Sequence, residues 1–117
     1  MQISTTGRHM ELTDSLRDYV EARMEKLNAE FPRLQNAHMV LNVEKHRQIA
    51  ELVVHAPHRF VVDAKEETDD MYASIDRAVE KAEKQLRRNR DKVTDHKAQE
   101  SLGELEAEVE AQQPVDE

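Results

Sequence analysis

The chain contains no cysteine, and this absence excludes disulfide frameworks, thiolate metal sites and cysteine nucleophiles. It also has no tryptophan, and aromatic residues make up only 3% of the sequence, so the core must be small and mostly aliphatic. Gly7 is the only glycine before residue 98, which excludes a glycine-rich phosphate-binding loop. The sequence has no run of about 18 apolar residues and no signal-peptide pattern, so we expect a cytoplasmic protein outside the membrane.

Motifs of catalysis and metal binding are absent as well. The sequence has no nucleophile elbow, Walker loop, dinucleotide-binding fingerprint or HExxH motif. Asp69 and Asp70 are adjacent carboxylates, but acidic residues are favoured at helix N-termini for electrostatic reasons alone. Six histidines are present, and His55 and His58 could approach each other across a turn. We interpret the histidines as scattered surface residues, and we expect a binding protein without metal, cofactor or small-molecule substrate rather than an enzyme.

The formal net charge of −8 is distributed unevenly along the 117 residues. Residues 1–97 carry all 17 lysines and arginines against 18 aspartates and glutamates, a net charge of −1. Residues 98–117 carry seven acidic residues and no lysine or arginine, a net charge of −7. We therefore expect one nearly neutral folded domain at 1–97 and an acidic, disordered tail at 98–117. Because local potential governs binding, the acidic total does not exclude a nucleic-acid partner.

The segment Asp69–Lys92 predicts one long amphipathic helix. Its apolar residues recur at helical spacing and form a single stripe of Met71, Ile75, Ala78, Val79, Ala82 and Leu86. At about 100° per residue, the charged residues divide into two flanks. One flank carries Arg77, Lys81, Lys84 and Arg88, and the other carries Asp76, Glu80 and Glu83.

Positive charge is densest toward the end of this helix. Between Lys81 and Lys97 the sequence has seven lysines and arginines against three acidic residues. Two interpretations are open from the helix alone. Cations near a helix C-terminus complement the macrodipole, and a charged flank is often simply solvated. A dense basic flank can also bind RNA phosphates, and that is the hypothesis we favour.

The remaining segments predict one further helix and four strands. Thr13 is the expected N-cap of a helix that runs to about Phe31, where Pro32 ends it. Its apolar face consists of Leu16, Val20, Met24, Leu27 and Phe31. Strands are predicted at Met1–Thr6, Ala37–His46, Ile49–Ala56 and Arg59–Ala64. We expect Gly7 to end the first strand, Pro57 and His58 to form a hairpin turn, and Thr68 or Asp69 to cap the long helix.

The element order β-α-β-β-β-α predicts an α+β two-layer sandwich. The first crossover contains a helix, so the first two strands can be parallel, and the other strands form an antiparallel meander. Both helical stripes can then cover one face of a four-stranded sheet. Tyr19 and Tyr72 lie near these stripes. They could stack on RNA bases, but we favour packing at the edge of the core.

Several stretches of residues 1–97 are distinctive as motifs. They are MQISTTGRHMELTDSLRDYVEARMEKL at the start, VEK at Val43–Lys45, DMYASID at Asp70–Asp76 and EKAEKQLRRNRDK at Glu80–Lys92. In these stretches the chain resembles the bacterial ribosome hibernation factors, the family of hibernation promoting factor and ribosome-associated inhibitor A. The DMYASID stretch followed by a basic helix end is the most specific part of the resemblance.

The resemblance implies a fold similar to a double-stranded RNA-binding domain with an extra first strand. It also implies binding to the small ribosomal subunit and its rRNA, and to intact ribosomes, in the channel that mRNA and tRNA use between head and body. Translation would be inhibited and inactive ribosomes stabilised in stationary phase or stress. The implied RNA-binding residues are Arg23, Lys26, Lys81, Lys84, Arg88, Arg90 and Lys92, and Arg87 is added on its charge alone.

Two departures from the family pattern leave alternatives open. The Pro57-His58 tip lacks the glycine often found there, which affects only the geometry of the hairpin. The acidic tail cannot be the additional dimerisation domain of long members, so we expect a short form that is monomeric. Short forms either promote ribosome dimers or keep ribosomes as inactive monomers. A further alternative is a protein-interaction module that modulates a transcription factor such as an alternative sigma factor.

Overall fold

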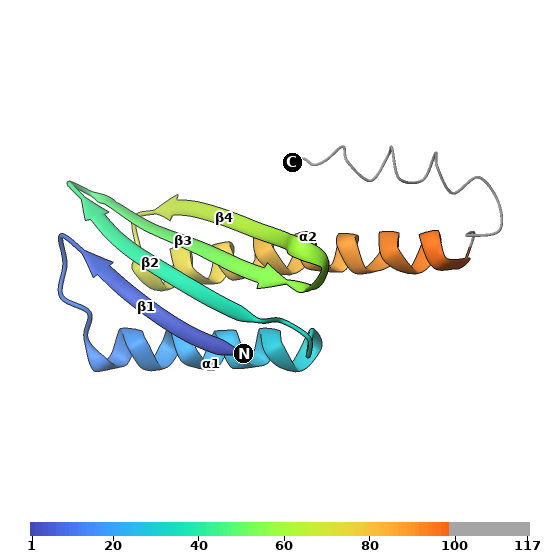
Figure 1. Ribbon diagram of the computed structural model, residues 1–117. Helices are drawn as coiled ribbons and strands as arrows, with labels where there is room; N and C mark the ends of the chain where they lie inside the picture. Colours follow the sequence, from blue (N-terminus) through green and yellow to red (C-terminus); the bar gives the residue numbers. More distant parts are fainter. Residues whose placement is uncertain (99–117) are drawn as a thin grey trace. The chain divides into compact units, whose positions relative to one another are not determined.

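The computed structural model describes residues 1–98, with side chains through residue 92, and contains the predicted order of elements (Figure 1). The elements are β1 (Gln2–Arg8), α1 (Asp14–Glu30), β2 (Asn36–Glu44), β3 (Arg47–Ala56), the short 3-10 helix η1 (Pro57–Arg59), β4 (Phe60–Thr68) and α2 (Met71–Ala98). Residues 1–85 form one compact unit, and a second unit begins at residue 86. The acidic tail expected at residues 98–117 lies outside the described residues, apart from Ala98.

The four strands form one mixed sheet in the order β1-β2-β3-β4. β1 is parallel to β2, and the pairs β2–β3 and β3–β4 are antiparallel. The helical crossover after β1 permits the parallel pair, because it returns the chain to the end of the sheet where β1 began. Figure 1 shows α1 and the start of α2 on the same side of the sheet. The predicted α+β two-layer sandwich, with a parallel first pair and an antiparallel meander, is therefore confirmed.

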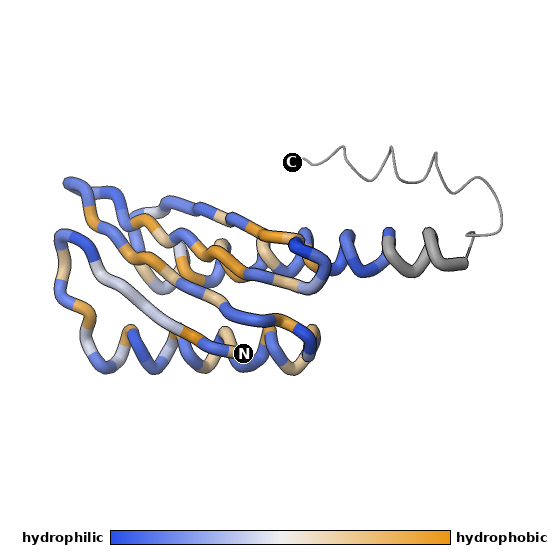
Figure 2. Tube along the Cα trace, in the orientation of Figure 1, coloured by the Kyte–Doolittle hydropathy of each residue, from blue (hydrophilic) through white to orange (hydrophobic). Residues whose placement is uncertain are grey.

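The core lies between the sheet and the helices, and alternate residues of the strands point into it. In β2 the side chains of Ala37, Met39 and Leu41 are buried, whereas the residues between them are only half-buried. Figure 2 shows apolar and polar segments along the strands. The largest fully buried apolar side chains are Met24, Met39, Leu41, Leu52, Ile75, Val20, Val54 and Val62. Each contributes roughly 1.5–3 kcal/mol by leaving water, so this aliphatic layer holds α1 on the sheet.

Ser74 is the one buried polar residue found among the described side chains. Its hydroxyl donates a hydrogen bond to the Gln48 carbonyl oxygen at 2.6 Å and lies 2.7 Å from the Thr68 hydroxyl. A buried hydroxyl without partners would cost about 1–3 kcal/mol, so both contacts matter. Ser74 therefore ties the beginning of α2 to β3.

β1 extends further than the sequence predicted, because Gly7 does not end the strand. Gly7 pairs with Leu41, and Arg8 continues the ladder by pairing with Asn42. A Cβ atom on Gly7 would lie 3.4 Å from the Leu12 Cβ and 3.5 Å from the Met10 Cγ. A Cβ atom at this position would make only ordinary van der Waals contacts, so the site does not require glycine, and the Gly7 backbone simply stays paired in the sheet. The prediction that it breaks the strand was wrong.

The meander also differs from the prediction at its ends. β4 continues to Thr68 because its last residues, although polar, keep pairing with β3. β2 ends at Glu44, since Lys45 adopts a left-handed backbone with φ of 58°. The Pro57-His58 turn widens into η1, where His58 and Arg59 have φ of 63° and 60°. In residues 1–98, which contain a single glycine, these turns therefore have non-glycine residues in the left-handed conformation.

Side-chain caps fix the starts of both helices. Thr13 caps α1 as predicted, because its Oγ1 accepts a hydrogen bond from the Leu16 amide at 3.2 Å. The cap of α2 is Asp70, not Thr68 or Asp69, because Asp70 Oδ2 accepts from the Ala73 amide at 3.1 Å. A cap of this kind is worth about 1 kcal/mol. Asp70 therefore sets where α2 begins.

Candidate nucleic-acid interface

Four of the predicted RNA-binding residues belong to the unit of residues 1–85. Arg23 and Lys26 lie on α1, and Lys81 and Lys84 lie on α2. Arg23 is half-buried, whereas the three lysines are exposed. The Lys81 Nζ atom is 3.5 Å from Glu66 Oε2 on β4, so Lys81 lies toward the β4 side of α2. The cations of α1 instead line a groove with Glu80 and Glu83 of α2.

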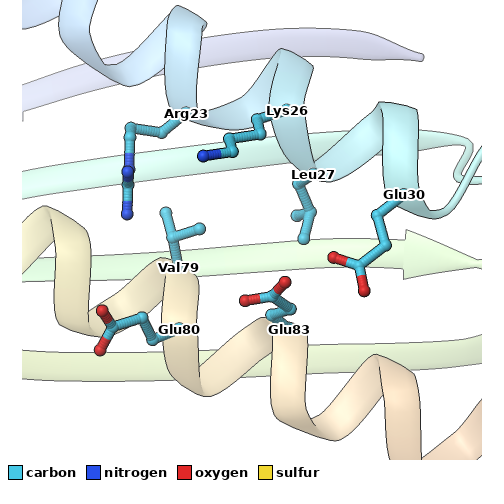
Figure 3. Close-up of a pocket in the computed structure, with 7 residues that line it drawn as sticks. All are labelled: Arg23, Lys26, Leu27, Glu30, Val79, Glu80 and Glu83. Atoms are coloured by element: carbon cyan, nitrogen blue, oxygen red, sulfur yellow. The ribbon is translucent and has the colours of Figure 1, made fainter.

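A groove between α1 and α2 contains the cations of the first helix. Its volume is about 180 Å³, and it is lined by Arg23, Lys26, Leu27, Glu30, Val79, Glu80 and Glu83. Figure 3 shows Arg23 and Lys26 extending from α1 toward α2, with the carboxylate of Glu83 turned toward the gap. Three carboxylates and two cations line this groove, so its net charge is not positive. The carboxylates of this groove therefore compensate the charges of Arg23 and Lys26, and the groove is not a basic surface.

Asp76 is the acidic residue that holds the two helices together beside this groove. Its Oδ1 atom lies 3.1 Å from Arg23 Nε and accepts a hydrogen bond from the Tyr19 hydroxyl at 2.7 Å. The side chains of Arg23 and Asp76 are 29% and 36% exposed, so water screens their attraction only in part. The sequence analysis placed Asp76 on the acidic flank of α2. It did not foresee that a predicted RNA-binding arginine would be its partner.

The two tyrosines meet beside this ion pair. The rings of Tyr19 and Tyr72 have centroids 4.9 Å apart and an interplanar angle of 84°, an edge-to-face contact. Tyr19 is half-buried, as expected for a residue at the edge of the core. Tyr72 is 39% exposed, which is more than that interpretation predicted. The hydrogen bond to Asp76, followed by partial burial, raises the pKa of Tyr19, so its hydroxyl remains a donor.

The other predicted residues lie on the part of α2 that follows Gln85. Arg88, Arg90 and Lys92 are exposed, and Arg87 is half-buried. Arg90 Nε is 4.0 Å from the carboxylate of the adjacent Asp91, whose side chain is 69% exposed. An exposed pair of this kind is worth about 0–1 kcal/mol, so it does not prevent the arginine from binding a phosphate. This segment presents Arg88, Arg90 and Lys92 to solvent, and their binding to RNA stays a prediction.

Two of the six histidines, His38 and His9, have hydrogen-bond contacts with polar side chains of neighbouring segments. Both ring nitrogens of His38 contact hydroxyls on β1, those of Ser4 and Thr6. His9 Nδ1 lies 3.0 Å from the side-chain oxygen of Asn42. Within residues 1–98, no three histidine or acidic side chains come together in a way that could hold a metal ion.

Neither helix, as far as residue 98, combines the length and apolar character that crossing a membrane requires.

The chain is similar in sequence to named bacterial proteins. Residues 3–94 match the family described as sigma 54 modulation protein / S30EA ribosomal protein. The ribosome hibernation promoting factor of Klebsiella oxytoca is 38% identical over 96 residues, which cover 82% of this chain and 100% of that protein. The protein of the same name from Escherichia coli (strain K12) is 35% identical over 96 residues, again covering 82% of this chain and 100% of that protein.

Two solved structures have the same fold. The N-terminal domain of Thermus thermophilus protein Y gives a TM-score of 0.69 at 38% identity, covering 75% of this chain and 98% of that one. A ribosomal subunit interface protein from Coxiella burnetii gives a TM-score of 0.73 at 26% identity, covering 78% of this chain and 99% of that one. The family match includes every candidate residue from Arg23 to Lys92. The chain therefore belongs to the sigma 54 modulation protein / S30EA ribosomal protein family.

Proposed function

We propose that this protein is a ribosome hibernation factor. It binds the small ribosomal subunit as a monomer, through rRNA, in the channel that mRNA and tRNA use between head and body. Occupation of that channel inhibits translation and stabilises inactive ribosomes in the cytoplasm during stationary phase or stress. The family membership supports the proposal, as do the relatives named ribosome hibernation promoting factor.

The observation that carries the proposal is the exposure of the cations of α2 within each of the two units. Lys81 and Lys84 in the first unit, and Arg88, Arg90 and Lys92 in the second, all have exposed side chains. Lysine and arginine side chains neutralise phosphates and position a protein on RNA without reading its sequence. A surface of this kind suits a folded RNA such as rRNA. The family consists of ribosome hibernation and modulation factors, which bind rather than catalyse, and the chain is not an enzyme.

Co-sedimentation tests the proposal directly. The wild-type protein is mixed with small subunits, with intact ribosomes and with a plain RNA duplex at two salt concentrations. It is expected to pellet with small subunits and ribosomes but not with the duplex. If about five phosphates are contacted, a fourfold rise in salt weakens binding on the order of a hundredfold or more. Sedimentation in a gradient also shows whether ribosome dimers or inactive monomeric ribosomes result.

Two triple variants provide the comparison. Alanine at Lys84, Arg88 and Arg90 is expected to abolish pelleting. Alanine at Arg8, Arg17 and Arg33 removes the same charge from exposed positions outside the candidate interface, and this variant should pellet like the wild type. Equal loss in both variants would mean that only overall charge matters, which the proposal does not allow.

The alternative is a protein-interaction module that modulates a transcription factor such as an alternative sigma factor. The family description, which includes sigma 54 modulation, keeps this alternative open. Under it the wild-type protein would not pellet with ribosomes at either salt concentration. The Lys84, Arg88 and Arg90 substitutions would then leave partner binding unchanged.

A further inference from the structure

The two tyrosines of the chain gather at one place on its surface. The sequence contains two tyrosines and no tryptophan, and aromatic residues are only 3% of the total. Tyr19 on α1 and Tyr72 on α2 are nevertheless in edge-to-face contact, with centroids 4.9 Å apart. In a chain so poor in aromatic residues, a pair that leaves Tyr72 exposed needs an explanation beyond burial of apolar area.

The two helices contact each other at two successive turns, first through the tyrosines and then through an ion pair. Arg23 follows Tyr19 by four residues on α1, and Asp76 follows Tyr72 by four residues on α2, so each pair lies on one face of its helix. Tyr19 touches Tyr72, Arg23 lies 3.1 Å from Asp76, and Tyr19 also donates to Asp76 at 2.7 Å. The four side chains form one cluster in which Asp76 fixes Tyr19 and Arg23, and Tyr19 supports Tyr72.

This cluster has the features of a site that is organised before a ligand binds. The ring of Tyr72 is 39% exposed although it is in contact with Tyr19, and Arg23 keeps 29% of its side chain exposed. Restricting a side chain in advance reduces the entropy lost on binding. Aromatic rings and arginine planes are the groups on which proteins stack unpaired bases of RNA.

We propose that Tyr72, supported by Tyr19 and flanked by Arg23, forms a stacking site for an unpaired nucleobase of ribosomal RNA. The inference rests on the proposed function and adds a nucleobase contact to the phosphate contacts of α2. Asp76 acts as a positioning residue, because it holds Tyr19 and Arg23 but does not itself stack.

The surrounding charge favours a base over a phosphate at this position. Asp70 caps α2 two residues before Tyr72, and the carboxylate of Asp76 already offsets the charge of Arg23. Carboxylates repel phosphate oxygens, whereas they accept hydrogen bonds from the amino groups of bases. A base that is splayed away from its backbone therefore suits the cluster better than the backbone itself.

Three substitutions of Tyr72 separate stacking from simple apolar contact. Tyr72→Phe keeps the ring, Tyr72→Leu keeps apolar bulk without a ring, and Tyr72→Ala removes both. Base stacking on an aromatic residue implies a loss of affinity for small subunits of about tenfold or more when the ring is removed. We expect that loss for Leu and Ala, and affinity close to the wild type for Phe. Melting temperatures show whether each variant is folded.

The salt dependence separates the loss of a stacked base from the loss of phosphate contacts. Because a stacked base carries no charge, Tyr72→Leu should leave the slope of log affinity against log salt unchanged. Loss of a phosphate contact, as in Lys84→Ala, should instead reduce that slope by about 1. If a folded Tyr72→Leu variant binds small subunits as tightly as Tyr72→Phe does, the stacking site is refuted even though ribosome binding stands.

Tyrosine fluorescence tests the site without ribosomes. With no tryptophan present, the emission of the chain comes from Tyr19 and Tyr72 alone. Short oligoadenylate should quench it saturably, and the abasic sugar-phosphate oligomer should not. Quenching should disappear in Tyr72→Leu. Equal quenching by the abasic oligomer, or quenching that persists in Tyr72→Leu, would overturn the inference. Failure of the wild type to pellet with ribosomes would refute the proposed function, and the fluorescence result would still decide on the site.

Discussion

The two flanks of α2 before residue 85 carry opposite charges and have different neighbours. One flank presents the exposed cations Arg77, Lys81 and Lys84. The other carries Asp76, Glu80 and Glu83 and lies toward α1, across a groove from that helix's own cations. On an RNA-binding surface the first flank supplies positive potential, whereas the second cancels much of the charge of α1. The difference teaches that the value of a cation for RNA binding depends on its nearest carboxylates.

Arg23 illustrates this dependence. Its Nε atom lies 3.1 Å from Asp76 Oδ1, so an approaching phosphate meets an ion pair rather than an isolated charge. Carboxylates within a Debye length, about 8 Å at physiological ionic strength, reduce the potential that a phosphate experiences. The sequence-based list gave Arg23, Lys26 and Lys84 equal standing. We therefore expect Lys84 to contribute more to RNA binding than the two residues of α1.

The largest expected effect is on RNA binding, and it compares a lysine on the basic flank of α2 with a lysine in the groove between α1 and α2. Lys84→Ala should weaken binding to small subunits about tenfold, since a hydrogen bond to a charged group is worth about 1.5–3 kcal/mol. Lys26→Ala should weaken binding less than about threefold, because Glu30, Glu80 and Glu83 line the same groove. Filter binding at two salt concentrations measures both, and the salt slope should fall by about 1 only for Lys84→Ala. Equal losses would mean that the groove carboxylates do not compensate Lys26.

The second largest effect concerns stability, and here the acidic flank of α2 should matter more than the basic flank. Asp76→Ala removes the acceptor of Tyr19 and the partner of Arg23, and it should lower the free energy of unfolding by about 1–2 kcal/mol. Arg77→Ala, the matched control on the exposed flank, should change it by less than about 0.5 kcal/mol. Urea unfolding followed by circular dichroism gives both values. A loss for Arg77→Ala as large as that for Asp76→Ala would contradict the assignment of Asp76 as the link between the helices.

Local patterns predicted most of the fold. The alternation in Ala37–His46 and the helical spacing in Asp69–Lys92 depend only on neighbouring residues. The strand formed within two residues of both predicted ends, and the helix began within two residues of its predicted start but continued to Ala98. The division of α2 into flanks follows from about 100° per residue alone. Errors arose where a local rule met tertiary packing. Gly7 resembles a strand breaker in sequence, but its backbone keeps pairing with Leu41 of β2.

The candidate interface was predictable only where it depends on spacing within a single helix. The cations on α2 could be assigned to a face from their spacing within one helix. The compensation of Arg23 and Lys26 could not be predicted, because it depends on which flank of α2 lies against α1. That arrangement is set by packing over the sheet. Tyr19 and Arg23 are four residues apart in the sequence, as are Tyr72 and Asp76. This spacing could not predict their contacts, because it does not show which faces of the two helices lie against each other.

A smaller effect compares the ion pairs of the two flanks with each other. A double-mutant cycle on Arg23 and Asp76 should give a coupling energy of about 1 kcal/mol, because both side chains are partly shielded. The cycle on Lys81 and Glu66, which are 3.5 Å apart with the lysine 47% exposed, should give about 0.3 kcal/mol. Unfolding of each single and double alanine variant supplies the energies. Equal coupling energies in the two cycles would contradict the claim that the Arg23–Asp76 pair is better shielded from water than the Lys81–Glu66 pair.

The smallest effect concerns the titration of Tyr19 at high pH. The hydrogen bond to Asp76 raises the pKa of Tyr19 above its ordinary value, so its protonated form is favoured in the folded state. The resulting stability is fully present below the unfolded pKa of about 10 and is lost as pH rises through the folded value. Tyrosinate absorbance follows this titration in a Tyr72→Phe background, where Tyr19 is the only phenol. Adding Asp76→Asn should return the pKa of Tyr19 toward its ordinary value, and an unchanged pKa would show that Asp76 does not hold this hydroxyl in solution.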